Sequence, residues 1–200
     1  MKLIIASNNK HKIREIKEIL GSQFEEIISV REAGIDHDTV EDGSTFLENA
    51  EKKAREIAEI SGCPSLADDS GICAHALDGA PGIYSARYSG ESGGHGDDEA
   101  NNDLLLANLS DKQDRGAHYT CAMVIAYPDG RKISAEGYLY GSIIKQRRGL
   151  GGFGYDPLFV PDGETRTVAE MTDDEKNKIS HRGNALRAVL AKLKNGEFDK

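Results

Sequence analysis

The order of the apolar segments is the feature that most constrains the fold of this chain. Lys2–Ala6 predicts a short buried strand, and the polar loop after it leads into a helix. Ile13, Ile16 and Leu20 mark the buried face of that helix, because they recur at helical spacing. Glu26–Val30 then predicts a second strand. Strands that alternate with helices in this way favour an α/β domain.

The second half of the chain adds a hairpin to this pattern. Ala117–Tyr127 and Lys132–Tyr140 both have strand character, and Pro128-Asp129-Gly130 between them is typical of a hairpin turn. The sequence contains no internal repeat, no low-complexity tract and no long linker. We therefore predict one α/β domain over residues 1–200, with a mixed sheet that can be built as two lobes around a cleft.

Capping boxes place two further helices. Thr45 with Glu48, and Thr172 with Glu175, have the spacing at which a hydroxyl and a carboxylate satisfy the free N–H groups of a helix start. Other predicted elements are a helix near Asp98–Leu109, a short strand Leu158–Val160 and a last helix over Ser180–Leu193.

Charge and cysteine content narrow the class of protein. The net charge of −9 disfavours general binding to nucleic acid or to an anionic membrane surface. No apolar run approaches the ~20 residues of a membrane helix. Three cysteines without a CxxC spacing suit a reducing cytoplasm. Residues 56–111 hold 11 acidic side chains against Arg87 alone, so this segment is a candidate metal-binding region.

The loop after the first strand has the composition of a phosphate-binding loop. It offers a hydroxyl, amides, lysines and the backbone N–H groups of a helix start, which together suit a phosphate chain. Its residues are Ser7, Asn8, Asn9, Lys10, His11 and Lys12. The alternative is a solvated turn in which Ser or Asn only caps the helix. The chain has neither a Walker A loop nor a GxGxxG at a strand-to-helix turn.

Carboxylates are grouped in a way that suits magnesium. Glu41 and the adjacent pair Asp68-Asp69 are hard oxygen ligands, and Mg²⁺ often binds one or two carboxylates together with substrate phosphates. One of the paired aspartates can hold metal while the other accepts a proton from water. Asp68-Asp69-Ser70-Gly71 is predicted to form a tight acidic turn after the strand Ser65–Ala67. The alternative is therefore a plain acidic surface turn.

Two later segments suit a nucleobase. In Phe153-Gly154-Tyr155-Asp156 the aromatic rings are expected to share one face of an extended chain, and Asp156 can accept from a base N–H. Lys176 and the group Ser180-His181-Arg182 add donors for a phosphate or a carbonyl oxygen. The alternatives are ordinary core aromatics for the first segment and a charged helix end for the second.

The order of these motifs resembles the inosine triphosphate pyrophosphatase family, the non-standard purine nucleoside triphosphate pyrophosphatases. The resemblance runs from residue 3 to about residue 190. The segments that carry it are Ala6–Lys12, Glu41–Ala54, Leu66–Gly71, Gly79–Gly90, Asp98–Asn102, Gly152–Pro157 and Glu175–Gly183. The glycine-rich stretch between Gly90 and Asp98 departs from the family pattern.

The resemblance implies an activity and an architecture. The activity is Mg²⁺-dependent hydrolysis of ITP, dITP or XTP to the monophosphate and pyrophosphate, which cleans the nucleotide pool. The architecture is a long central mixed β-sheet flanked by helices, with two lobes, a substrate cleft between them and a homodimer. Alternatives are a pyrophosphatase for other modified nucleotides and a nucleotide-binding protein without catalysis.

The resemblance also implies roles for individual residues. Glu41 and Asp69 match the metal positions, and Asp69 also matches the base for the attacking water, with Asp68 supporting it. The phosphate contacts are Ser7, Asn9, Lys12 and Lys53, with Lys10 nearby. Ser70 and Lys176 contact the nucleotide. Phe153 and Tyr155 flank the purine, and Asp156, His181 and Arg182 bind its edge.

Overall fold

The computed structural model describes residues 1–90 and 97–199, with the exception of the His11 side chain. The predicted departure from the family pattern between Gly90 and Asp98 falls mainly on residues 91–96, which lie outside the described residues. No helix in the described part of the chain is long and apolar enough to cross a membrane.

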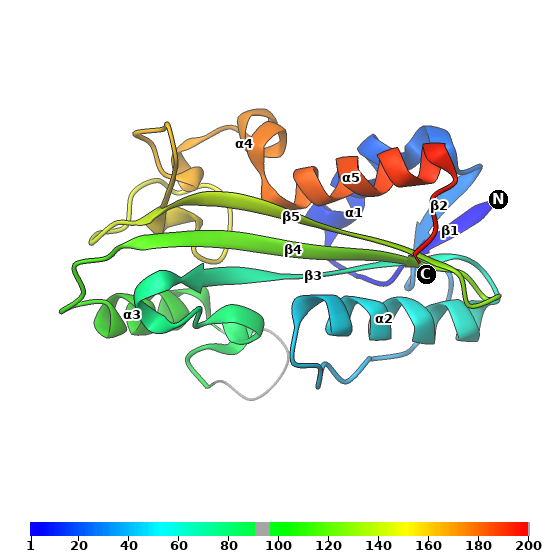
Figure 1. Ribbon diagram of the computed structural model, residues 1–200, viewed down its shortest axis with the longest axis horizontal. Helices are drawn as coiled ribbons and strands as arrows, with labels where there is room; N and C mark the ends of the chain where they lie inside the picture. The colour runs from blue at the N-terminus through cyan, green and yellow to red at the C-terminus, as the bar shows by residue number, and fades with distance from the viewer. Residues whose placement is uncertain (91–96, 200) are drawn as a thin grey trace. The chain divides into compact units, whose positions relative to one another are not determined.

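A mixed six-stranded sheet with helices beside it forms the framework, as the sequence predicts (Figure 1). Its order is β2-β1-β3-β4-β5-β6. β1 pairs in parallel with β2 and β3, and β5 pairs antiparallel with β6. The strands are β1 (Lys2–Ile5), β2 (Glu26–Ser29), β3 (Ser65–Ala74), β4 (Gly116–Ala126), β5 (Lys132–Ile143) and β6 (Phe159–Pro161).

The predicted helices are present, and their starts have the expected chemistry. They are α1 (Lys10–Leu20), α2 (Phe46–Ser61), α3 (Asp98–Asn108), α4 (Asp173–Ile179) and α5 (His181–Asn195). Thr45 Oγ1 accepts the N–H of Glu48 at the start of α2. Thr172 and Glu175 form a complete capping box at the start of α4. The β4–β5 turn is closed by the Gly130 N–H, which donates to Tyr127 O at 3.0 Å.

The chain divides into two compact units. Unit 1 comprises Met1–Asp69, Cys121–Gly137 and Arg182–Lys200, and unit 2 comprises Ser70–Thr120 and Tyr138–His181. β3, β4 and β5 each contribute residues to both units.

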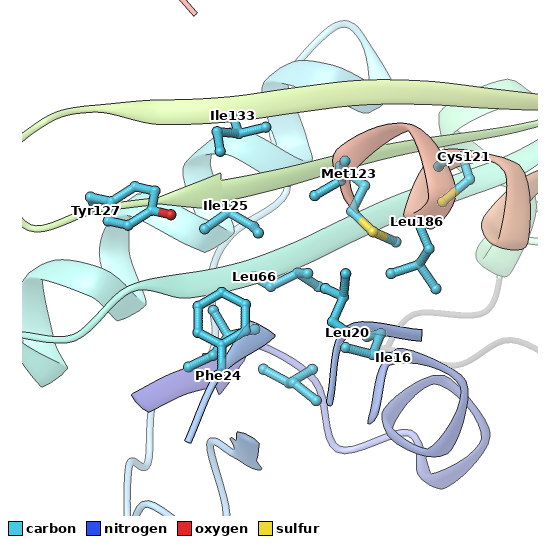
Figure 2. Close-up of a cluster of buried hydrophobic side chains, with 14 residues drawn as sticks. Ile16, Leu20, Phe24, Leu66, Cys121, Met123, Ile125, Tyr127, Ile133 and Leu186 are labelled. Carbon is cyan, nitrogen blue, oxygen red and sulfur yellow. The ribbon is translucent and has the colours of Figure 1, made fainter. Parts of the chain in front are cut away.

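The central strands of unit 1, which are β1 and the parts of β3 and β4 that belong to this unit, bury both of their faces. One face packs against α1 and α5, with Ile16, Leu66, Met123 and Leu186 in the same apolar cluster (Figure 2). The other face packs against α2 through small residues that include Ala54. α2 lies on the opposite side of the strands from α1 and α5 (Figure 1). Successive residues of a central strand therefore face different helices.

The acidic segment is part of a strand, and the predicted tight turn at Asp68–Gly71 is wrong. β3 continues without a break from Ser65 to Ala74. Asp-Asp-Ser-Gly has turn composition, but here both aspartates are buried, at 3% and 9% exposed, and have ion-pair partners. Those pairs make a carboxylate tolerable inside a strand, where composition alone favours a turn.

Gly71 has a packing role in this strand, in unit 2. A Cβ at this position would overlap Ser85 Oγ and the carbonyl oxygen of Gly82. Ser85 Oγ in turn accepts the N–H of Ile72 at 2.9 Å. The glycine that suggested a turn is therefore needed for close packing against the neighbouring segment.

A buried ion-pair network in unit 1 joins β3 to two helices. Asp68 Oδ2 is 2.9 Å from Lys12 Nζ of α1 and 3.3 Å from Arg182 Nε of α5. A second carboxylate oxygen, Glu15 Oε2, is 3.7 Å from Arg182 Nη1. Although burial acts in the opposite direction, Lys12 and Arg182 hold the pKa of Asp68 well below its usual value. Asp68 is therefore charged at neutral pH.

We predict that D68N strongly destabilises the chain. The substitution leaves Arg182 buried without its carboxylate partner on β3, which typically costs about 3–5 kcal/mol. Urea unfolding at about pH 7 measures this loss. D129N is the matched control and is expected to change the unfolding free energy little, because the Asp129–Arg131 pair is exposed.

The pH dependence of the unfolding free energy tests the same interaction between Asp68 and its cationic partners. The folded pKa of Asp68 lies below the ~3.9 of an unpaired aspartate, so its contribution is fully present above about pH 4 and is lost as the pH falls further. The difference in unfolding free energy between the wild type and D68N should therefore shrink as the pH is lowered. A difference that stays constant down to about pH 2 would contradict this assignment.

Candidate functional site

The predicted phosphate loop lies in unit 1 and also caps α1. Asn9 Oδ1 accepts the N–H of Lys12 at 3.2 Å, and Ser7 Oγ accepts the N–H of Asn9 at 3.1 Å. Helix capping and phosphate binding are therefore compatible, because the same loop caps α1 and positions the first turn of that helix for a phosphate. The side chain of His11 lies outside the described part of the structure.

A second group of predicted residues in unit 1 gathers around Lys53 of α2. Lys53 Nζ is 2.9 Å from Glu41 Oε1 and 3.9 Å from Asp69 Oδ1. These side chains are largely shielded, with 14%, 30% and 12% of their surfaces exposed. The loop before α2 and the middle of β3 thus bring two carboxylates to one cation, although they are far apart in sequence.

The electrostatics of this group favour a carboxylate that can take up a proton. Burial is the main cause that raises the pKa of Asp69 above its usual value, and the negative charge of Glu41 adds to it. Lys53 opposes this shift. Although burial acts in the opposite direction, the charges of Asp69 and Glu41 raise the pKa of Lys53, which therefore stays protonated. A carboxylate with a raised pKa beside a fixed cation is typical of catalytic sites.

Asn49 also belongs to this group, although no sequence motif predicts a role for it. Its amide is fully buried and bridges two segments, because Oδ1 accepts the N–H of Gly43 at 2.8 Å while Nδ2 donates to Asp69 Oδ2 at 3.0 Å. A side chain at Gly43 would overlap this amide. Asn49 and Lys53 are four residues apart on one face of α2, and this spacing is the sequence signal that could have indicated the role of Asn49.

The chemistry of this donor set fits Mg²⁺. Two carboxylates already share one cation, Lys53, so their oxygens are aimed at a common region. Mg²⁺ commonly binds one or two carboxylates and leaves its other positions to water and phosphate oxygens. Among the described residues, no three His, Cys, Asp or Glu side chains form a larger set of metal ligands.

Unit 2 holds the other predicted cluster, centred on Asp156. Its Oδ2 is 2.6 Å from Lys176 Nζ and accepts the N–H of Phe153 at 3.0 Å. Lys176 Nζ also lies 4.5 Å from the centre of the Phe153 ring, as in a cation–π contact. The Phe153 ring is 45% exposed, so it offers an aromatic face beside a charged pair.

The expectation of an extended chain at Phe153–Asp156 is wrong. The Asp156 N–H donates to Phe153 O, Gly154 has a φ of +60°, and a 3₁₀ turn follows at Asp156–Leu158. The ring of Tyr155 is 4% exposed and belongs to the apolar core of unit 2, with its hydroxyl donating to Ser85 O at 2.8 Å. The glycines permit this turn, so the two-residue alternation of side chains along an extended strand does not hold for this segment.

α3 supports this turn through two polar residues, whose motif was noted without a role for either side chain. Gly154 N–H donates to Asp98 Oδ2 at 2.7 Å, and Gly154 O accepts Asn102 Nδ2 at 2.8 Å. Asn102 is 1% exposed. Asparagines on an otherwise apolar helix face are the sequence signal that could have indicated this contact.

The adjacent residues His181 and Arg182 fall in different units. His181 is in unit 2, where its ring stacks on Tyr119 with centroids 4.7 Å apart. Arg182 is in unit 1, 4% exposed and paired with Asp68. Ser70, next to Asp69, is the first residue of unit 2 and is half-buried. The predicted residues are thus divided between the two units, with the phosphate loop and the Lys53 group in unit 1 and the Asp156 cluster in unit 2.

Curated proteins of known name are similar to this chain over nearly its whole length. The dITP/XTP pyrophosphatase of Clostridium perfringens is 51% identical over 201 residues, which is 96% of this chain and 97% of that protein. The dITP/XTP pyrophosphatase of Streptomyces coelicolor is 48% identical over 203 residues, which is 94% of this chain and 95% of that protein.

Solved structures and a family model agree with these relatives. The Staphylococcus aureus Ham1 protein matches with a TM-score of 0.90 and 38% identity, over 98% of this chain and 100% of that chain. A Coxiella burnetii HAM1 protein matches with a TM-score of 0.89 and 38% identity, over 98% and 99%. The model of the Ham1 family matches residues 3–192. Fold, motifs and relatives together show that the chain belongs to the Ham1 family.

Proposed function

We propose that this chain hydrolyses non-standard purine nucleoside triphosphates (dITP, ITP and XTP) to the monophosphate and pyrophosphate. Its relatives at 48% and 51% identity are named dITP/XTP pyrophosphatases. The observation that carries the proposal is the buried carboxylate of Asp69, placed beside Glu41 and Lys53. Within this one group of side chains, Asp69 supplies a base and Lys53 supplies a positive charge for the phosphates.

Asp69 acts as the general base in this proposal. It accepts a proton from a water molecule as the water oxygen bonds to a phosphorus atom of the α–β phosphoanhydride. The bond from that phosphorus to the bridging oxygen breaks, and the bridging oxygen leaves on the other product. Asn49 keeps the Asp69 carboxylate oriented through its 3.0 Å hydrogen bond. Proton transfer of this kind typically contributes about 10²–10⁴-fold to the rate.

The cations of unit 1 bind the triphosphate in this proposal. Lys12 and Lys53 both reach into polar clusters and keep part of their surface exposed, at 21% and 14%. Ser7 and Asn9 hold the loop before α1 so that its first turn can approach a phosphate. Phosphoryl transfer depends mainly on positioning and on neutralising negative charge, which these groups supply.

Glu41 and Asp69 would hold Mg²⁺ in this proposal. The ion neutralises phosphate charge when it is bound, as in other phosphoryl-transfer enzymes. Lys53 Nζ lies within 4 Å of an oxygen atom of each carboxylate and holds the two carboxylates near one another.

Unit 2 binds the purine in this proposal. The exposed ring of Phe153 stacks on the base, and His181 donates to the carbonyl oxygen at C6. Adenine carries an amino group at that position, so it would leave two donors facing each other. Unpaired polar groups of this kind discriminate strongly between substrates.

Two further properties belong to the proposal. The family resemblance supports a homodimer. The cysteine pattern, with three cysteines and no CxxC, supports a cytoplasmic location.

A substrate panel tests the activity. Pyrophosphate release is measured for ITP, dITP, XTP, GTP, ATP and dUTP, and we expect the first three to exceed ATP by about 10²-fold or more in kcat/KM. Equal rates on ATP would overturn the proposal. Preference for dUTP would instead indicate a pyrophosphatase for modified pyrimidines, and binding without turnover would indicate a nucleotide-binding protein.

Replacing the base separates catalysis from binding. We expect D69N to lower kcat for ITP by about 10²–10⁴-fold, because an amide cannot take up the proton from water. The Kd for ITP, measured by calorimetry without added metal, is expected to stay within about threefold of the wild-type value. Turnover that survives in D69N would show that another group is the base.

Metal dependence is tested by removal and by substitution. Activity is expected to be lost in excess EDTA and restored by added Mg²⁺. E41Q should raise the Mg²⁺ concentration needed for half-maximal activity. D42N is the matched control, because Asp42 is the neighbouring carboxylate and pairs with Lys52 of α2 at 2.7 Å. An equal shift in both variants, or full activity in EDTA, would place the metal elsewhere.

A further inference from the structure

A buried tyrosine lies beside the Asp156 cluster of unit 2. Tyr119 is in β4, is 7% exposed, and lines the same recess as Asp156, Lys176 and His181. The sequence patterns give it no role beyond that of a core residue. Burial of a tyrosine in a core is unfavourable unless its hydroxyl has a hydrogen-bond partner there.

The ring of Tyr119 sets the plane of a neighbouring imidazole. The rings of Tyr119 and His181 are stacked, with centroids 4.7 Å apart and planes 10° from parallel. Tyr119 also meets the fully buried ring of Phe159 edge to face, with centroids 4.8 Å apart. Because Phe159 and the strand backbone anchor Tyr119, the stacked contact restricts the rotation of the His181 ring.

The hydroxyl of Tyr119 contacts the carboxylate of the same cluster. It donates to Asp156 Oδ1 at 3.4 Å, while Asp156 Oδ2 accepts from Lys176 and from the Phe153 N–H. Burial and the negative charge of Asp156 raise the pKa of Tyr119 well above its usual value. The hydroxyl is therefore protonated throughout the working pH range and is always available as a donor.

A single side chain thus touches both His181, which the proposed function assigns to the base, and Asp156, to which the family resemblance gives a place at the edge of the base. The direction of the N–H donors of His181 depends on the plane of its ring. The position of Asp156 determines where Lys176 and the exposed Phe153 lie. Small errors in the placement of such groups lower kcat/KM.

We propose that Tyr119 is a positioning residue for base recognition, which orients His181 through its ring and Asp156 through its hydroxyl. This inference rests on the proposed function, because it gives a specificity role to a residue behind the base-binding side chains. Tyr119 does not need to touch the nucleotide. Its effect should therefore appear in KM and in base discrimination more than in the chemical step.

The variants Y119L and Y119F test this role. Y119L removes both contacts, and we expect KM for ITP to rise about 10- to 100-fold and the preference for ITP over ATP to fall to a similar extent, with kcat within about threefold. Y119F keeps the stacked ring and loses only the long hydrogen bond, so its KM should lie between those of the wild type and Y119L.

Y127L is the matched control. Tyr127 directly follows β4, is also 7% exposed, and its ring packs edge to face on Phe198 in unit 1. Y127L should lower the thermal unfolding temperature much as Y119L does and leave KM and base discrimination unchanged. A loss of discrimination in Y127L equal to that in Y119L would mean that general destabilisation is responsible, and would overturn the proposal.

Binding of IMP and AMP, measured by calorimetry without metal, separates this inference from the proposed function. If the wild type binds IMP more tightly than AMP, Y119L should lose most of that difference. Wild-type KM and discrimination in a folded Y119L would overturn the positioning role alone. If Y119L does not fold, Y119M takes its place in the same measurements. A wild type that shows no preference for ITP or IMP would overturn both.

Discussion

The ion pairs of Asp68 are the interaction on which the rest of unit 1 depends. A carboxylate inside a central strand is unfavourable unless its charge is matched, and here Lys12 and Arg182 match it from α1 and α5. These contacts tie the first helix and the last helix to the same strand. They also fix the position of the loop before α1, whose residues are the proposed phosphate contacts. One buried residue, Asp68, therefore both pairs with two cations and joins α1 and α5 to β3.

Much of the fold followed from local patterns. Helical spacing, capping boxes and the Pro128-Asp129-Gly130 turn predicted elements that the structure contains. The exceptions were the segments at Asp68–Gly71 and Phe153–Asp156. In the first, turn-like composition lies in a strand because the partners of the aspartates are distant in sequence. In the second, glycines permit a turn that a two-residue period cannot anticipate. Tertiary contacts decided both cases.

The candidate site was predictable by residue type more than by arrangement. Glu41, Lys53 and Asp69 were all chosen from motifs, but their convergence depends on Asn49, to which no motif assigned a task. Asp98, Asn102 and Tyr119 are similar cases in unit 2. The residues that hold the functional groups in place are identified by their contacts in the folded structure. Those contacts join segments that are far apart in the sequence, so no local motif marks them.

The alternation of β3 gives the pair Asp68-Asp69 a property of its own. Neighbouring residues of a strand point to opposite sides, so one aspartate meets the cations of α1 and α5 while the other meets Lys53 of α2. A shift of the strand by one residue would put one aspartate in the place of the other and bring Ala67 or Ser70 into the remaining place, so one helix layer would lose its carboxylate partner. An insertion or a deletion in this segment is therefore expected to remove a carboxylate from at least one helix layer, since only the length of the segment keeps the two identical side chains in different roles.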